Sequence, residues 1–143
     1  MTRAERRAFH AIVGAVLLLP LVAGFVGAFG GIEGMAGLFG ADAALVVSPL
    51  LRNNFRAISA AFASWFPLVV WSLAAPAERA AVFRIIVGFG FVAGLARATG
   101  WAVEGDPGPI AAGIMAIELI GMPILLLWHA RLARAAGGAS SPR

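Results

Sequence analysis

Four long apolar runs, separated by shorter polar or mixed stretches, dominate the pattern of this sequence. They extend over about 9–29, 55–75, 80–99 and 109–130, and charged residues barely interrupt them. Because a helix rises about 1.5 Å per residue, each run is long enough to cross about 30 Å of hydrocarbon. The pattern predicts an all-α fold, a four-helix transmembrane bundle that forms one domain over 1–143 and ends in a flexible tail at 134–143.

The first run follows a basic head and ends in small residues, so a cleaved signal peptide is the alternative to a retained helix. The head holds Arg3, Arg6 and Arg7, and the small residues lie at 27–31. The apolar part of a signal peptide is only about 7 to 15 residues long. The run over 9–29 is longer than that, which favours a retained first span.

The connection between the first two runs, 30–54, is long and too apolar for a free loop. Glu33 and Asp42 are its acidic residues, and its large apolar residues include Met35, Leu38, Phe39, Leu45, Val46, Leu50 and Leu51. Apolar residues at helical spacing beside a few acids predict a short amphipathic helix in the membrane interface. A re-entrant segment that dips into a cavity of the bundle is the alternative.

Composition supports a membrane protein and argues against nucleic-acid binding. Hydrophobic residues make up 61% of the chain and charged residues 13%, about half the share of a soluble domain. Every one of the 11 basic residues is Arg, and most lie where apolar runs end, as flanking charges do. They form no basic face with interleaved aromatics, so no nucleic-acid partner is expected.

The distribution of Arg predicts the orientation, since cytoplasmic flanks carry the excess of positive charge. Three Arg fall on the side of the first and third connections: Arg52, Arg56 and Arg97. Eight fall on the side of the termini: Arg3, Arg6, Arg7, Arg79, Arg84, Arg131, Arg134 and Arg143. We therefore expect a multi-pass protein of the bacterial inner membrane with both termini in the cytoplasm.

Two further motifs have structural interpretations. Gly90 and Gly94 place two bare backbone patches on one helix face, where a second helix can approach closely. His10 and His129 fall near the ends of their runs and are interpreted as membrane-edge residues rather than a metal or haem pair. Because the chain has no cysteine either, we predict no metal site and no cofactor.

Ionisable residues at membrane depth are the candidate functional feature, because they are costly in hydrocarbon. Glu118 lies well inside the fourth run, and Arg56 and Arg97 enter the membrane from the side of the first and third connections. Asn53, Asn54 and Asp106 lie near the same ends, so we expect a buried polar cluster of these residues with Glu118, Arg97 and Arg56. Such a cluster either locks the helices together or lines a cavity that binds a polar head or moves a proton.

The segment 53–60, Asn-Asn-Phe-Arg-Ala-Ile-Ser-Ala, resembles the Asn-x-x-Arg-small signature of a family of small bacterial four-span proteins known only as a domain of unknown function. Arg97, the turn 105–107 and Glu118 resemble the order of an Arg, an acidic Gly-Pro turn and a Glu in that family. DoxX-like proteins are a more distant likeness. The resemblance implies the same four-span bundle and no established activity.

Three functions compete. The first is an accessory or structural protein of the inner membrane, either a subunit of a larger complex or a self-associated bundle. The second is a bundle that binds or converts a lipophilic small molecule through the buried Glu and Arg residues. The third is an oligomeric transporter or channel, although four spans without an evident internal repeat argue against alternating access by a monomer. With no catalytic signature in the sequence, an enzyme is the less favoured reading.

Overall fold

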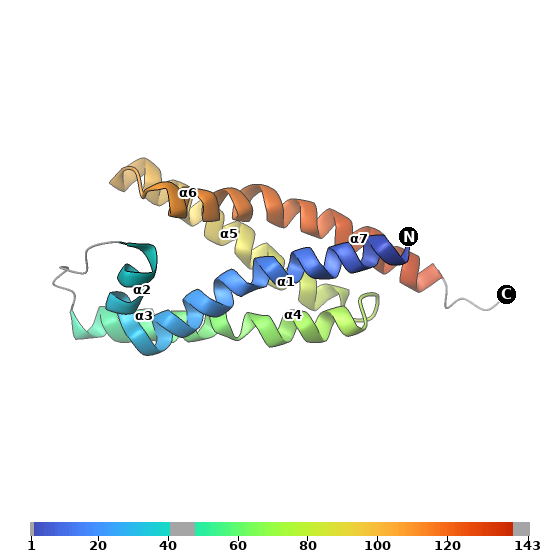
Figure 1. Cartoon of the computed structure of the whole chain (residues 1–143), viewed down its shortest axis with the longest axis horizontal. Coiled ribbons are helices and arrows are strands. Elements are labelled where there is room, and N and C mark those ends of the chain that lie inside the picture. The colour runs from blue at the N-terminus through green and yellow to red at the C-terminus, as the bar shows by residue number, and fades with distance from the viewer. Residues whose placement is uncertain (1, 41–47, 139–143) are drawn as a thin grey trace. The chain divides into compact units, whose positions relative to one another are not determined.

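The computed structural model describes residues 2–40 and 48–138, and these residues fold into helices without a strand. The order of elements is α1 (Arg3–Phe25), the π-helical turn η1 (Val26–Gly30), α2 (Gly31–Phe39), α3 (Pro49–Ala63), α4 (Trp65–Ala74), α5 (Ala80–Glu104), α6 (Pro109–Ala116), the π-helical turn η2 (Ile117–Gly121) and α7 (Met122–Gly138) (Figure 1). The predicted all-α class is confirmed.

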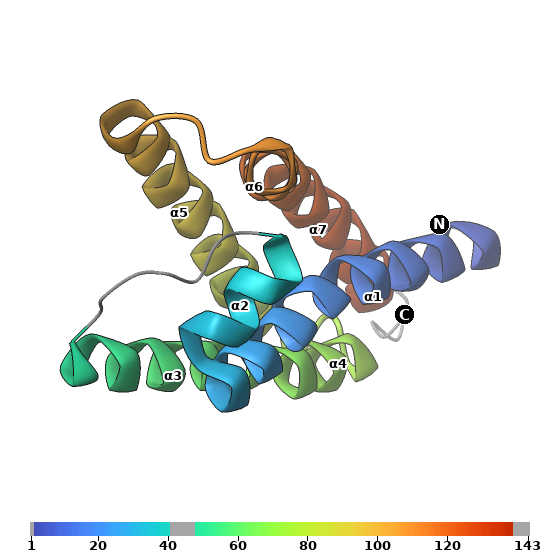
Figure 2. The same cartoon turned by 60° about the vertical axis from the view of Figure 1, so that its left-hand side comes forward.

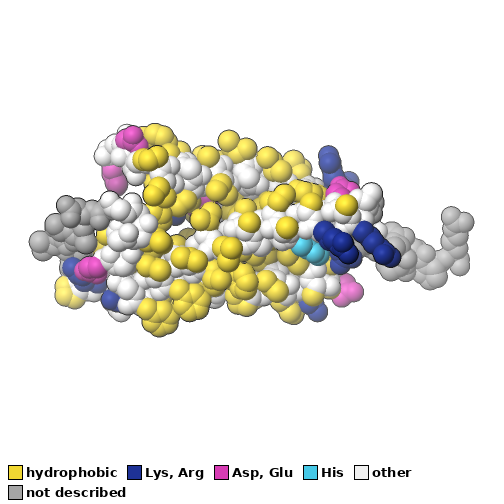
Figure 3. All heavy atoms as spheres, in the orientation of Figure 1, with side chains coloured by type: hydrophobic (Ala, Val, Ile, Leu, Met, Phe, Trp, Pro, Cys, Tyr) yellow, Lys and Arg dark blue, Asp and Glu magenta, His cyan; other side chains and the backbone are white. Residues whose placement is uncertain are grey.

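Four helical stretches are long and apolar enough to cross a membrane, as the apolar runs predicted. They are Arg3–Phe39, Pro49–Ala74, Ala80–Glu104 and Pro109–Ala135. Figure 3 shows hydrophobic side chains along these helices and charged side chains gathered near helix ends. Large residues such as Leu18, Ile58 and Leu127 are more than half exposed, which fits a hydrocarbon solvent rather than water. These features indicate a multi-pass membrane protein.

The second stretch begins earlier than expected and is interrupted in the middle. Ser48 caps α3 by accepting a 3.3 Å hydrogen bond from the Leu51 N–H, and Pro49 occupies the first helical position. Pro67 disrupts the regular helix that precedes it, because its ring clashes with the carbonyl four residues back. The helix accordingly breaks at Ser64, between α3 and α4.

The chain divides into two compact units. Ala11–Leu68 is called the α1–α3 unit, and Met1–His10 with Val69–Arg143 is called the hairpin unit. The expectation of one domain over the whole chain stays a prediction.

In the α1–α3 unit, α1 and α3 cross at glycine. A Cβ on Gly24 would lie only 2.6 Å from the Ala63 nitrogen, so these two backbones are in direct contact. The backbone changes direction at Gly31, which has a φ of 68°. The helix α2 begins there and packs on η1 and α3. A short helix therefore lies in the connection, but its interfacial or re-entrant position stays a prediction, and 41–47, with Asp42, Leu45 and Val46, lie outside the described residues.

The hairpin unit consists mainly of α5 and the α6–η2–α7 run, joined by the short connection 105–108 (Figure 2). A Cβ on Gly90 would lie 2.9 Å from Met122 Cε, and one on Gly94 would lie 2.8 Å from Glu118 Cβ. Both glycines thus face the returning helix, where side chains from η2 and α7 occupy the space.

The last helix is longer than the sequence suggested. α7 continues to Gly138, past the end of the fourth apolar run at about 130, and the flexible tail at 134–143 stays a prediction. Ala and Arg favour a helix, and Arg134 also donates a 3.1 Å hydrogen bond to the Ala130 carbonyl one turn back. Residues 139–143 lie outside the described part of the chain.

Candidate functional site

Glu118 lies on the π turn η2 and is only 8% exposed. Pro123 explains the turn: it lacks an N–H, and its ring crowds the carbonyl four residues earlier, so the backbone widens. The Met122 N–H bonds to the Ile117 carbonyl, five residues back, instead of four. The widened turn places Glu118 on the side of the helix that faces α5, against Gly94.

Arg97 and Glu118 form an ion pair between α5 and η2. Arg97 Nε donates to Glu118 Oε2 at 2.9 Å, and the two side chains are 46% and 10% exposed. The glycine at position 94 makes this approach possible, because Arg97 lies three residues further along the same helix face. The structure therefore brings together two of the residues expected in the polar cluster.

The remaining N–H groups of Arg97 have no hydrogen-bond partner among the residues that the structure describes. An Arg side chain carries five N–H donors, and Glu118 uses one of them. Glu118 thus holds the guanidinium in place and leaves most of its donors available.

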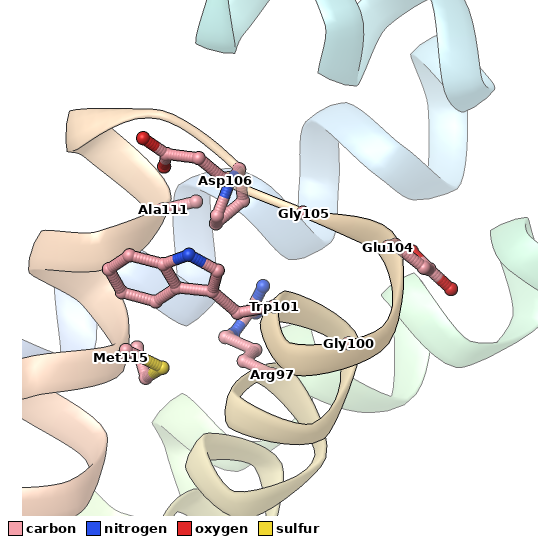
Figure 4. A pocket seen from close by; sticks show the side chains of 9 residues that line it. Arg97, Gly100, Trp101, Glu104, Gly105, Asp106, Ala111 and Met115 are labelled. Carbon is pink, nitrogen blue, oxygen red and sulfur yellow. The ribbon is translucent and has the colours of Figure 1, made fainter.

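A hollow of about 380 Å³ opens beside this pair, between the end of α5 and the start of α6. Four of its lining residues come from one face of α5, where they recur at helical spacing: Arg97, Gly100, Trp101 and Glu104. The remaining lining residues are Gly105, Asp106, Pro107, Ala111 and Met115. Figure 4 shows the indole of Trp101 reaching from α5 toward α6, with Arg97 beneath it and Glu104 pointing away.

Asp106 belongs to the same hollow and is fixed by the connection. Its Oδ1 accepts a 2.8 Å hydrogen bond from the Gly108 N–H. Gly105 and Gly108 both have positive φ, 100° and 84°, a conformation that a side chain disfavours. The turn 105–107, which stood out in the sequence, therefore holds a carboxylate on the rim of the hollow.

Arg56, Asn53 and Asn54 lie on α3, in the α1–α3 unit. Arg56 donates from one terminal nitrogen to the carbonyls of Ala28 and Phe29, at 2.9 and 2.7 Å, where η1 ends. Its guanidinium is thus engaged at the end of η1, within the first helical stretch. The expected grouping of these three residues with Glu118 stays a prediction.

Two features were not foreseen. One is the π turn at Glu118, whose signal in the sequence is Pro123. The other is the burial of His129, which is 0% exposed and stacks on Phe83 with ring centroids 4.1 Å apart and an angle of 13°. Neither His129 ring nitrogen has a hydrogen-bond partner within the described residues. Its position near a helix end suggested a membrane-edge residue, whereas the aromatic neighbours enclose it.

Within the described part of the chain, no group of three His, Asp or Glu side chains is placed to hold a metal ion. The Arg97–Glu118 pair and the hollow form the candidate site, because their donors and carboxylates suit a polar organic group.

The sequence model of a family described as a domain of unknown function, DUF4345, matches residues 8–129. The chain belongs to the DUF4345 family. The match extends from the first apolar helix to His129 and includes the whole hollow of this DUF4345 chain. It confirms the resemblance to an uncharacterised family, whereas the likeness to DoxX-like proteins stays a prediction. No curated protein and no solved structure matches the sequence.

Proposed function

We propose that this protein binds a lipophilic molecule with a polar head group inside the membrane. One observation carries the proposal: a half-exposed Arg97, anchored by a buried Glu118, lines a hollow between two membrane-long helices. An ion pair that served only to lock helices would need no open space beside its cation.

The lining divides into a polar and an apolar part, as an amphipathic ligand requires. Arg97 and Asp106 supply charged groups, whereas Trp101, Ala111 and Met115 supply apolar surface. Ligand pockets are typically apolar with a few placed polar groups. Trp101, near the end of its helix, also suits the level of lipid head groups.

Binding is favoured over catalysis by what surrounds Glu118. General acid–base chemistry needs a proton carrier in hydrogen-bond reach of the reacting group. The partner of Glu118 is Arg97, which does not release its proton in proteins. A carboxylate so engaged is suited to holding the guanidinium.

We further propose that the membrane is the bacterial inner membrane, with the termini in the cytoplasm and the hollow toward the opposite side. The 8 to 3 distribution of Arg supports this orientation. The molecule that enters the hollow would then come from the outer leaflet.

Filling the hollow tests the proposal. Ala111 lines it, and the adjacent Ile110 is 53% exposed and does not. The full chain is purified from its source membrane in a mild detergent, and native mass spectrometry identifies what it retains. We expect one retained amphiphile, its loss in Ala111→Phe, and its retention in Ile110→Phe, the matched control.

Two results would contradict the proposal. One is a parent protein that retains no amphiphile at detergent concentrations that preserve its fold. The other is equal retention in both variants, which would place the amphiphile elsewhere on the helices.

An accessory role is the second candidate, supported by how little of the described chain projects beyond its helices. The connections 75–79 and 105–108 are short, so helix faces are the main surfaces for recognition. The same spectra test this role: a second protein in fixed stoichiometry, or a stable dimer, would support it.

A further inference from the structure

The charges around the hollow are of both signs. Arg97 contributes a positive charge whose neutralising partner, Glu118, is almost fully buried behind it. Asp106 contributes a negative charge on the opposite part of the lining. A ligand that complements this lining needs a positive and a negative group of its own.

We propose that the hollow takes the head group of a zwitterionic phospholipid, with the phosphate on Arg97 and the ammonium between Asp106 and Trp101. The inference rests on the proposed function, because it names the class of amphiphile that the hollow receives. The bilayer itself is the source of this ligand.

The phosphate half follows from the geometry of Arg97. Its Nε is taken by Glu118, so its orientation is set, and its terminal N–H groups remain available. The planar guanidinium fork matches two oxygens of a phosphate, and it is more weakly hydrated than an ammonium. A lipid phosphate can therefore meet Arg97 without breaking the ion pair.

The ammonium half follows from Asp106 and Trp101. The Gly108 N–H occupies Asp106 Oδ1, and Oδ2 has no hydrogen-bond partner among residues 2–40 and 48–138. The Trp101 indole lies across the hollow below the Asp106 side of the connection (Figure 4). An ammonium is attracted both to a carboxylate and to the face of an indole ring.

Ligands of a single charge fit less well. An anionic head group on Arg97 would lie near Asp106 with nothing to offset the repulsion, and Glu118 has already neutralised part of the attraction. A purely cationic ligand would meet the half-exposed guanidinium. Repulsion between charges of like sign in the same hollow therefore favours a ligand that carries both signs.

The test measures which lipids the full chain selects. The purified chain is delipidated in detergent and equilibrated with equimolar phosphatidylethanolamine, phosphatidylcholine and phosphatidylglycerol, and native mass spectrometry counts the bound lipids. We expect the two zwitterionic lipids to be retained in preference to phosphatidylglycerol. Asp106→Asn keeps the acceptor for the Gly108 N–H but removes the charge, and we expect it to lower this preference about threefold.

Two further variants control the test. Glu78→Gln removes one negative charge from an exposed position outside the hollow, so the preference should not change. The double variant Arg97→Gln with Glu118→Gln removes both members of the pair, so neither charge is left unpaired. We expect it to retain none of the three lipids while keeping its fold.

The outcomes separate the inference from the proposed function. Equal retention of the three lipids, a preference for phosphatidylglycerol, or an Asp106→Asn variant that selects like the parent would overturn the inference and leave an amphiphile site standing. An equal change in Glu78→Gln would also overturn it, because net charge would then explain the selectivity. If the parent retains none of the lipids and no source-membrane amphiphile, both the inference and the proposed function fail.

Discussion

A Cβ on Gly94 would lie 2.8 Å from the Cβ of Glu118, a separation that real side chains do not adopt. The absence of a side chain at Gly94 is thus the condition for placing Glu118 against α5, and hence beside Arg97. Close packing and the charged pair, two separate motifs in the sequence, are one arrangement in the structure.

The first prediction follows from this contact. We expect Gly94→Ala to lower the free energy of unfolding by about 1 to 3 kcal/mol, because the new methyl group forces η2 away from α5. Gly88→Ala is the matched control, since nothing lies within 4 Å of a Cβ there. It should be neutral or stabilising by about 0.5 kcal/mol, because Ala favours the helix. Thermal unfolding in detergent measures both, and equal effects would argue against the close contact.

The second prediction concerns the unequal burial of the ion pair. Arg97→Gln leaves the buried Glu118 without its cation and should cost about 2 kcal/mol or more. Glu118→Gln leaves Arg97, which is half exposed and partly solvated, so we expect a loss of about 1 kcal/mol or less. Unfolding midpoints of the two single variants test this order, and the reverse order would show that the pair is not held as described.

The third prediction concerns the end of η1, where Arg56 binds two backbone carbonyls. Arg56→Gln withdraws donors from the carbonyls of Ala28 and Phe29, and we expect a local loss of about 1 kcal/mol. Hydrogen exchange in a peptide that covers 26–39 should become faster. Arg52→Gln, which removes the contact with the half-exposed Glu33, should change exchange in that peptide less. Equal acceleration would mean that Arg56 does not secure the helix end.

The fourth prediction is the orientation. A reporter that is active only in the cytoplasm should be active when it is fused after Arg143. The same reporter fused after Asp106, with three membrane-long helices before it, should be inactive, and a periplasmic reporter should give the opposite pair of results. Activity of a periplasmic reporter after Arg143 would reverse the orientation.

The helices themselves could be predicted, because length and hydropathy depend only on local composition. Their interruptions could not be predicted as reliably. Pro67 and Pro123 mark where a helix is disturbed, but whether the backbone breaks, as at Ser64, or widens into a π turn, as at Glu118, depends on the neighbouring helix.

The sequence predicted which residues belong to the candidate site better than it predicted which of them contact each other. Glu118 was identified because it lies at membrane depth. Its proximity to Arg97 was expected because both residues lie toward the same side of the membrane. The partner of Arg56 was not predictable, because the carbonyls of Ala28 and Phe29 become available only where η1 ends and the backbone turns at Gly31. His129 was missed because its burial depends on Phe83 and Phe9, from two distant segments.

The aromatic contact of His129 with Phe9 has a consequence for biosynthesis. The ring centroids are 6.2 Å apart, although one residue is near the start of the chain and the other near its end. At about 5 to 20 residues per second, a ribosome needs on the order of 10 s to extend the chain from Phe9 to His129. Phe9, which is 0% exposed once folded, must spend that interval among lipids or the insertion machinery. The contact between Phe9 and His129 can therefore form only after synthesis has passed His129, long after the first helix has been made.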